Sequence, residues 1–426
     1  MSHDTQPRVR DLRRAFHRHP EPGWCEFRTT ARVVEDLERI GVDEVAVGRE
    51  ALAADERMAV PPDADLRQWH DRARRAGVRG DILERTADGH TGVVATLKQG
   101  DGPCVGLRVD LDAISMEESG DADHRPTAEG FRSEHDGYMH ACGHDAHIAM
   151  ALGTLEAVKS SAFEGTLKLF FQPAEEISGG GKAMAESGHL DDVDYLLALH
   201  VGLDHPTGEV VAGVERPLAM AHLTATFEGA SAHAGKAPNQ GANAMQAAAS
   251  AIQNAYAIPR HCDGLTRVNV GRIEGGAASN VIAEEVTIEA EVRGETTALM
   301  EYTRTELERV LYGAAEMHDC DVTPRVISES PRVDSHPALR ELVGNVAWGI
   351  DGIEAVVPTE AFGVSEDGTY LMQRVQDNGG LATYLLVGTD TPTNHHTPTF
   401  DIDERSLDIG VSLLTETAVE LSRGRP

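Results

Sequence analysis

The chain has 426 residues, 41% of them hydrophobic, and a formal net charge of −32 that comes from 70 acidic and 38 basic side chains. This length exceeds one ordinary compact unit and predicts two domains, and the acidic balance argues against a nucleic-acid partner. No apolar run approaches the roughly 20 residues that a membrane span requires, so no membrane partner is expected.

The charge and cysteine content also bear on the surroundings of the protein. Lysine occurs only five times, and nearly all bases are arginine. An acidic, lysine-poor surface is typical of proteins that work in concentrated salt. At 1 M salt the Debye length is about 3 Å, so repulsion among the surface carboxylates is screened. A halophilic source is therefore predicted. The opening residues Met1–Gln6 are polar and lack the apolar stretch of a secretory signal. Five cysteines without paired spacing fit a reducing compartment, and a soluble cytoplasmic protein is therefore expected.

The first half of the chain predicts an α/β unit. Helical periodicity from Arg8 to Gly41, interrupted near Pro20, indicates two helices. Residues from about 47 to 89 are charged and weakly periodic, which favours an insertion laid on the surface with a helix from Asp65 to Ala76. A predicted helix at Ala146–Val158 then lies among four predicted strands, which are Thr91–Leu97, Cys104–Val109, Leu167–Phe171 and Tyr195–Val201.

At about Arg216 the pattern changes to that of an α+β sandwich. The predicted order is strand, helix, strand, strand, helix, strand, at Ala221–Phe227, Ala242–Ala255, Arg267–Ile273, Val286–Arg293, Ala298–His318 and Asp321–Ser328. The chain then returns to α/β character, with a helix at Pro337–Ala347, a strand at Ala382–Gly388 and a helix at Glu404–Leu421. We therefore predict a catalytic domain made of residues 1–216 and 331–426, interrupted by an inserted domain at 217–330.

Candidate metal ligands are dispersed over most of the chain. They are Cys142, His144, one acid of the pair Glu175-Glu176, His200 and His396. This dispersal favours a catalytic site, because structural zinc sites usually take their ligands from two closely spaced pairs. His200 closes an apolar run, and an α/β sheet places its active-site residues at such strand ends.

The ligand chemistry leaves the metal and several assignments open. One thiolate, imidazoles and a carboxylate suit zinc, manganese or cobalt. Five ligands exceed the need of one tetrahedral ion, so two ions roughly 3.5 to 4 Å apart are favoured. Neighbouring side chains of an extended segment point to opposite sides, so one of Glu175 and Glu176 is expected to bind metal and the other to act as a base. His140, His147 and His395 lie beside proposed ligands and could replace them, and in so acidic a chain the glutamate pair could also be an ordinary surface feature.

The order of these motifs resembles that of the di-metal amidohydrolases, which include aminoacylases, glutamate carboxypeptidases and auxin-conjugate hydrolases. The resemblance rests on Cys142–Asp145, Gln172–Glu176, Ala232–Gly235 with Asn243-Ala244, Asn280–Ile282, Ser365–Asp367 and His396–Phe400, and it spans nearly the whole chain. Phe16–Thr29 and the insertion around Gly48–Glu50 are most similar to the branch that acts on p-aminobenzoyl-glutamate. One departure is Ala283, which stands where proline is common in the family.

The resemblance implies a metallopeptidase-like catalytic domain with a central mixed sheet flanked by helices, plus an inserted ferredoxin-like α+β domain that mediates dimerisation. It also implies two divalent ions per chain, Glu175 as general base and acid, and His233 as a donor to the oxyanion in the partner's site. The implied metal ligands are Cys142, His144, Glu176, His200 and His396. Asn280 and Arg293 are implied to bind the substrate. A guanidinium can bind a carboxylate with two parallel hydrogen bonds, which suits Arg293 to this role. Arg293 could also be an ordinary surface arginine.

The expected function is metal-dependent hydrolysis of an amide between an acyl or aroyl group and an amino acid, with p-aminobenzoyl-glutamate as the favoured substrate and a free carboxylate on it. A broader N-acyl-amino-acid amidohydrolase or small-peptide carboxypeptidase is the near alternative. A thiol hydrolase with Cys142 as nucleophile and a non-enzymatic metal-binding or ligand-binding protein are remote ones. A homodimer is expected, with a heteromer containing a related chain as the alternative.

Overall fold

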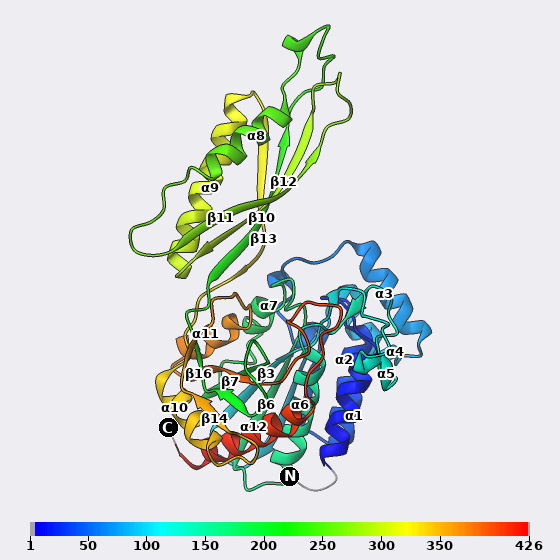
Figure 1. The fold of residues 1–426 in the computed structure, drawn as a ribbon, viewed down its shortest axis with the longest axis vertical. Helices are drawn as coiled ribbons and strands as arrows, with labels where there is room; N and C mark the ends of the chain where they lie inside the picture. The colour runs from blue at the N-terminus through cyan, green and yellow to red at the C-terminus, as the bar shows by residue number, and fades with distance from the viewer. Residues whose placement is uncertain (1–4, 425–426) are drawn as a thin grey trace. The chain divides into compact units, whose positions relative to one another are not determined.

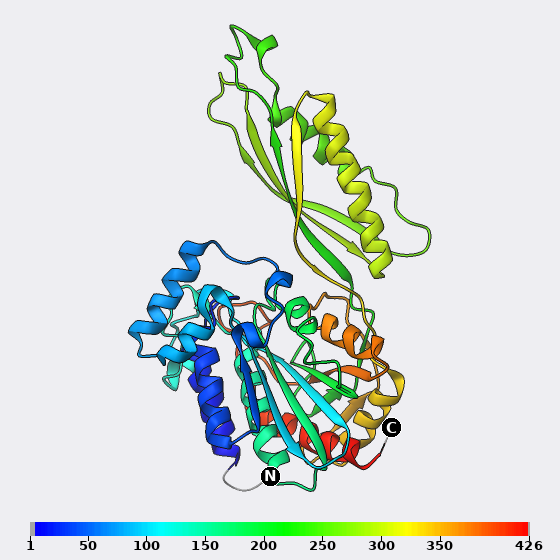
Figure 2. The same cartoon turned by 180° about the vertical axis from the view of Figure 1, so that it is seen from behind.

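A computed structural model describes residues 5–424, so Met1–Asp4 of the polar opening segment lie outside the described residues. The chain forms two compact units. The first contains the chain up to Glu215, Val333–Phe362 and the chain from Glu366 onward, and the second contains Arg216–Arg332 with Gly363–Ser365. Figures 1 and 2 show the ribbon of each unit from two sides.

The first unit is built on a mixed sheet of eight strands. In order across the sheet these are β1 (Glu44–Val47), β2 (Val93–Gln99), β6 (Gly165–Gln172), β3 (Cys104–Asp110), β7 (Tyr195–Val201), β16 (Leu381–Val387), β8 (Glu209–Val211) and β14 (Ala355–Val357). Strands β6, β3, β7 and β16 run parallel, so their carboxyl ends lie along one edge of the sheet. Short pairs, β4 (Ile114–Ser115) with β5 (Tyr138–Met139) and β9 (Val214–Glu215) with β15 (Glu360–Ala361), lie outside it.

Helices bury both faces of this sheet. The helices of the first unit are α1 (Thr5–His17), α2 (Phe27–Ile40), α3 (Asp63–Arg75), α4 (Gly80–Arg85), α5 (Arg125–Ala128), α6 (His144–Lys159), α7 (Gly181–Ala185), α10 (Pro337–Ala347), α11 (Thr369–Asp377) and α12 (Arg405–Arg423). Alternate residues of one strand enter two separate cores. Leu197 and Leu199 of β7 pack in the core that includes residues of α1, α6 and α12, whereas Leu196 and Ala198 pack with residues of α7 and α11. Burial on both faces explains why the central strands are continuous apolar runs.

The charged segment 47–89 is anchored to the first unit by a small number of buried side chains. Leu66, Trp69 and Ala73 of α3 are buried, as are Ile82 and Leu83 of α4, and four of these five side chains join the second of the two cores. The spacing of residues 66, 69 and 73 places them on one helix face, so a short apolar stripe anchors an otherwise charged helix. The predicted helix itself is confirmed, with its bounds shifted by one or two residues.

The second unit is an α+β sandwich. Its antiparallel sheet has the order β11 (Thr266–Gly275), β12 (Glu285–Gly294), β10 (Ala219–Glu228) and β13 (Asp321–Ser330), and its helices are α8 (Ala244–Ala255) and α9 (Thr297–Met317). Both helices pack on the sheet, and they share a core with alternate residues of β10, such as Leu223, Ala225 and Phe227. The chain order βαββαβ, with the first strand between the third and the fourth, is the ferredoxin-like arrangement that we predicted.

Two further expectations can be compared with the described residues. All five cysteines are free thiols. Within residues 5–424, none of the helices combines the length and the apolar character that crossing a membrane requires.

Candidate metal centre

The candidate ligands of the first unit gather at the carboxyl edge of the parallel strands. His200 is the penultimate residue of β7, the Glu175-Glu176 pair follows β6, and Cys142 and His144 flank the start of α6. The turn between the last two depends on Gly143, whose φ is +92° and whose added Cβ would lie 2.5 Å from Val201 Cγ2. A side chain at this position would therefore clash with β7 and displace both ligands.

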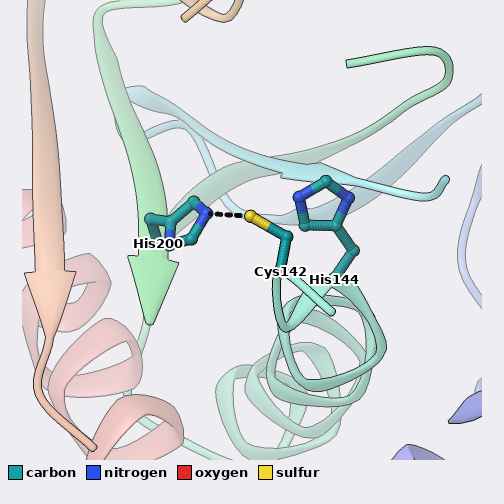
Figure 3. Close-up of side chains that lie close together, drawn as sticks. All are labelled: Cys142, His144 and His200. Atoms are coloured by element: carbon teal, nitrogen blue, oxygen red, sulfur yellow. Dashed lines mark hydrogen bonds between the residues drawn. The ribbon is translucent and has the colours of Figure 1, made fainter. Parts of the chain in front are cut away.

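Figure 3 shows the side chain of Cys142 between those of His200 and His144. The Sγ atom of Cys142 lies 3.3 Å from Nε2 of His200. The other ring nitrogen of His200, Nδ1, donates to the carbonyl oxygen of Val201 at 2.8 Å. This second bond fixes the tautomer, so the lone pair of Nε2 faces Cys142 and is available to a metal.

His144 is oriented by the same kind of bond. Its Nδ1 donates to the carbonyl oxygen of Asp112 at 2.9 Å. Its buried Nε2 has no hydrogen-bond partner within the described residues. The nearest oxygens to Nε2, on Asp110, Glu175 and Glu176, are each 3.8 Å away, which is too long for a hydrogen bond.

Two carboxylates, those of Asp112 and Glu26, hold the backbone of the segment that carries the glutamate pair. The N–H groups of Glu175 and Glu176 donate to the two carboxylate oxygens of Asp112, at 3.1 and 3.0 Å. Ala174, before them, has φ of +56° and donates its N–H to Glu26 at 2.7 Å. A non-glycine residue in this left-handed region is a strained turn that the surrounding bonds must stabilise, which is a recurrent feature of functional sites.

His396 completes the cluster from the last part of the chain. Its backbone N–H donates to the carbonyl oxygen of Ala141, next to Cys142, at 2.9 Å. Its Nε2 lies 3.4 Å from Oε2 of Glu176. Two sets of three ligand atoms, Cys142 with His144 and His200, and Cys142 with Glu176 and His396, each lie within 4.8 Å of one another. The structure thus brings together all five side chains that we proposed as ligands.

The environment of these five residues fits a bound cation. Oε1 of Glu176, like Nε2 of His144, is buried and has no hydrogen-bond partner among the described residues. Burial first, and then neighbouring acids such as Asp112, raise the pKa of Glu176 to about 8. Burial opposes protonation of His144, yet Asp110 and the other carboxylates raise its pKa to about 10. Unpartnered ligand atoms amid surplus negative charge are what a divalent ion would satisfy.

The three alternative histidines have other surroundings. Both nitrogens of His147 are engaged, because Nδ1 contacts Asp110 at 2.5 Å and Nε2 accepts from the N–H of Val201 at 3.0 Å. His395 donates to the carbonyl oxygen of Val201 at 3.2 Å. His140 is buried without hydrogen bonds, and it lies outside every candidate group found among the described residues.

Cys142 has the wrong electrostatic environment for a nucleophile. Burial, followed by the charges of Glu176 and Glu175, raises the pKa of its thiol well above the ordinary value. A catalytic thiolate requires the opposite, a cationic neighbour that lowers the pKa. The contact with His200 is therefore better explained by shared ligation than by a nucleophile and its base.

Sequence reasoning assigned no role to a second layer of residues around the cluster. Asp110 is the last residue of β3, Asp112 follows it by two positions, and Glu366 lies beside Glu175. Burial, followed by the charges of Glu366 and Asp367, raises the pKa of Glu175 well above its ordinary value. Only the position of Asp110 and Asp112 at the end of an apolar strand could have singled them out among 70 acidic side chains.

The remaining predicted site residues lie in the second unit, in two separate places. His233 and Asn280 are exposed and neighbouring, since residues 233 and 281 form an antiparallel bridge and the N–H of Ala234 donates to the carbonyl oxygen of Asn280 at 3.0 Å. Arg293 is near the far end of β12, about 26 Å along the strand from its start. There its guanidinium binds Glu291 at 2.6 and 3.0 Å and lines a cavity of about 650 Å³.

Comparisons with known proteins place these observations in context. A sequence profile described as peptidase family M20/M25/M40 matches residues 106–420. The indole-3-acetyl-aspartic acid hydrolase of Enterobacter agglomerans is 39% identical over 417 residues, covering 97% of this chain and 95% of the relative. One of the named subunits of the p-aminobenzoyl-glutamate hydrolase of Escherichia coli is 38% identical over 417 residues, with the same coverage. The crystal structure of the aminobenzoyl-glutamate utilization protein from Klebsiella pneumoniae superposes with a TM-score of 0.83 at 34% identity, covering 97% of this chain and 95% of that one.

Proposed function

This chain belongs to peptidase family M20/M25/M40 and is a metallopeptidase-like amidohydrolase, and we propose that it cleaves p-aminobenzoyl-glutamate into p-aminobenzoate and glutamate. The observation that carries this proposal is the nearly full-length similarity to the p-aminobenzoyl-glutamate hydrolase chain of Escherichia coli and to the aminobenzoyl-glutamate utilization protein. The similarity to an indole-3-acetyl-aspartic acid hydrolase favours a second candidate of the same kind. Both named substrates join an aromatic acyl group to an acidic amino acid.

The proposed centre holds two divalent ions on Cys142, His144, Glu176, His200 and His396. This donor set suits zinc, manganese and cobalt. Two divalent ions held by these residues would polarise the scissile carbonyl as Lewis acids and would lower the pKa of water, which makes a stronger nucleophile available at neutral pH. The fit rests on the unpartnered ligand atoms of His144 and Glu176 and on the convergence of all five side chains.

Glu175 is the proposed proton carrier. Its carboxylate takes a proton from the attacking water and delivers it to the leaving nitrogen of the amide. A raised pKa suits a group that must hold a proton between these two steps, and burial with nearby acids raises the pKa of Glu175. Its backbone bond to Asp112 fixes the segment from which the carboxylate projects.

The second unit is proposed to mediate dimerisation and to place His233 at the partner's site, where it would donate to the oxyanion. Nδ1 of His233 accepts from the N–H groups of Gly235 and Lys236, at 3.2 Å each, so its Nε2 would carry the proton and act as the donor. Asn280 is proposed to bind substrate beside it. Arg293 would have to leave Glu291 to bind a substrate carboxylate. A heteromer is the alternative assembly, since the Escherichia coli relative is named as one subunit of its hydrolase.

Product release tests the proposed substrate. The purified chain, with manganese or zinc in molar KCl, is expected to release p-aminobenzoate and glutamate with kcat/KM at least tenfold above that for N-acetyl-glutamate. Excess chelator should abolish turnover. Faster cleavage of indole-3-acetyl-aspartate would favour the second candidate, cleavage of N-acetyl amino acids alone would indicate a general amidohydrolase, and activity that persists in chelator would contradict the metal centre.

We also propose that the protein works in concentrated salt and, given its free thiols, in a reducing cytoplasm. With a net charge of −32, self-repulsion should destabilise the folded chain at low ionic strength. Raising KCl from 0.05 M to 2 M is therefore expected to increase Tm by several degrees, measured by differential scanning fluorimetry at constant pH. The same experiment in NaCl separates screening from a specific potassium effect, and a Tm that falls with either salt would contradict halophily.

A further inference from the structure

Two adjoining cavities lie in the first unit among α1, α2, α3 and the segment at His135. Their volumes are about 300 and 210 Å³, and both are lined by His19 and Arg28. None of the proposed metal ligands contributes to either cavity. The cavities therefore need an explanation of their own.

Basic side chains gather at these cavities although the protein is strongly acidic. The lining includes six of them, namely Arg18, His19, Arg28, Arg32, Arg72 and His135. Arg18 donates to the carbonyl oxygen of Gly130, and Arg32 is paired with Asp36 at 2.8 Å. The guanidinium groups of Arg28 and Arg72 form no ion pair with any acid within residues 5–424, and Arg72 instead lies over the ring of Trp69 at 5.1 Å. Two half-buried arginines without counterions are unexpected in a chain with 70 acids.

Among the described residues, no acid in the lining lies within ion-pair distance of either guanidinium. The buried carboxylate of Glu21 accepts from the backbone N–H groups of Arg28 and Thr29, at 3.1 and 2.8 Å, and from the hydroxyl of Thr29. Burial raises the pKa of Glu21 to about 7, against the opposing effect of these hydrogen bonds and of the charge of Arg28. Glu134 has a 62% exposed side chain and approaches His19 Nδ1 only to 3.8 Å, and Glu35 is also exposed.

Two imidazoles in the lining are held in the neutral form, mainly by burial and in smaller part by the nearby arginines. Burial, and then the charges of Arg28, Arg18 and Arg72, lower the pKa of His19 to about 4. Burial likewise lowers the pKa of His135 to about 4, and Arg72, His19 and Arg28 add to the shift against a hydrogen bond to Pro20. Nδ1 of His19 is buried and has no hydrogen-bond partner within the described residues. An anion would supply both the missing charge and the missing partner.

We propose that these cavities form a binding site for a small oxyanion with two negative charges, held by Arg28, Arg72 and His19. A guanidinium binds phosphate and carboxylate oxygens with parallel hydrogen bonds, and two of them offer charge for a dianion. Inorganic phosphate and a short dicarboxylate share this chemistry and fit volumes of 210 to 300 Å³. The site is separate from the metal centre and does not depend on the proposed reaction.

Calorimetric titration of the metal-loaded full chain with inorganic phosphate and with succinate, at fixed ionic strength and pH 7.5, tests the site. At least one of the two dianions is expected to bind and to bind more tightly than acetate, and their relative affinities identify which chemistry is preferred. The double variant Arg28→Gln/Arg72→Gln should weaken this binding at least tenfold. The matched control Arg67→Gln/Arg75→Gln removes the same charge from exposed positions of α3 and should change the affinity less than twofold.

Hydrogen exchange locates the binding without any substitution. Phosphate or succinate should slow exchange in peptides that cover residues 15–35 and 72–78 of the wild-type chain. Equal affinity in both double variants would assign the binding to another place, such as the metal centre, and would overturn the proposal. The proposal would also be overturned if neither dianion bound the wild-type protein, or if exchange slowed only outside these two segments.

Discussion

Replacing Glu175 by glutamine is expected to lower kcat for p-aminobenzoyl-glutamate by about 10²- to 10⁴-fold, the usual contribution of a positioned general acid–base group. The substitution preserves the size of the side chain and removes its negative charge together with its ability to carry a proton. Metal content should stay at the wild-type level, because Glu175 is not one of the five proposed ligands. Steady-state kinetics and elemental analysis of the dialysed variant measure both quantities.

The surroundings of Glu175 explain why the loss should appear in kcat. The residue is only 7% exposed, and the neighbouring charge of Glu366 adds to burial in raising its pKa. Its backbone is held by Asp112, so glutamine should occupy the same place without rearranging the loop. A group that only bound substrate would instead raise KM and leave kcat unchanged.

A control and two contrary outcomes make the test specific. Glu164→Gln removes the same charge from an exposed position and should leave both turnover and metal content unchanged. Wild-type turnover in Glu175→Gln would remove Glu175 from the mechanism. Loss of metal together with activity would show that Glu175 is a ligand and that Glu176 is the candidate base.

The main elements of the fold could be predicted because their periodicity is local. The run Tyr195–Val201 is apolar throughout since both faces of β7 are buried, and its prediction is confirmed residue for residue. The short strands β8 and β14 were missed. Each has three residues, and their pairing joins residues 209–211 to residues 355–357 across the inserted domain. A strand of three residues is too short for its hydrophobic periodicity to be recognised, and the sequence does not indicate which distant strand it pairs with.

The buried face of segment 47–89 could not be predicted for a similar reason. Leu66 and Trp69 are isolated apolar residues among charged neighbours, so the average character of the segment concealed a buried helix face. Trp69 also packs edge-on against Tyr138 with ring centroids 5.0 Å apart, a contact that no local pattern contains. Burial of this segment depends on tertiary contacts that sequence periodicity alone did not provide.

The candidate site was accessible to sequence reasoning where the residue types are rare. A cysteine and a histidine two residues apart stand out, and the structure brings Cys142, His144 and His200 together. Asp112 did not stand out, because acids are common in this chain and the role of this one is set by its bonds to the N–H groups of Glu175 and Glu176. Likewise, only hydrogen-bond geometry separates His147 from His144, which sequence reasoning left as alternatives.

A buried charge cluster next to the metal centre provides the second large prediction. Arg13 on α1 is fully buried and binds Asp145 at 2.8 Å and Asp401 at 2.7 Å. Asp145 also binds Nδ1 of His17 at 2.8 Å, and His17 reaches Glu118 at 3.0 Å. Burial opposes ionisation of Asp145, yet Arg13 and His17 hold its pKa well below the ordinary value. The cluster thus joins α1, the start of α6 and the segment before α12.

Replacing Arg13 by methionine is expected to lower the free energy of unfolding by about 3 to 5 kcal/mol, because the buried Asp145 keeps only His17, and Asp401 only Arg125, as cationic partners. Arg74→Met on α3 is the matched control. Its side chain is 65% exposed and pairs with Asp71, which is 50% exposed, so its loss should cost no more than about 1 kcal/mol. Urea unfolding at pH 7 in constant KCl measures both. A second substitution, Asp145→Asn, should recover part of the loss in Arg13→Met, since it removes one of the buried negative charges that Arg13 neutralised. Equal effects of Arg13→Met and Arg74→Met would mean that the buried cluster contributes no more to stability than a surface ion pair.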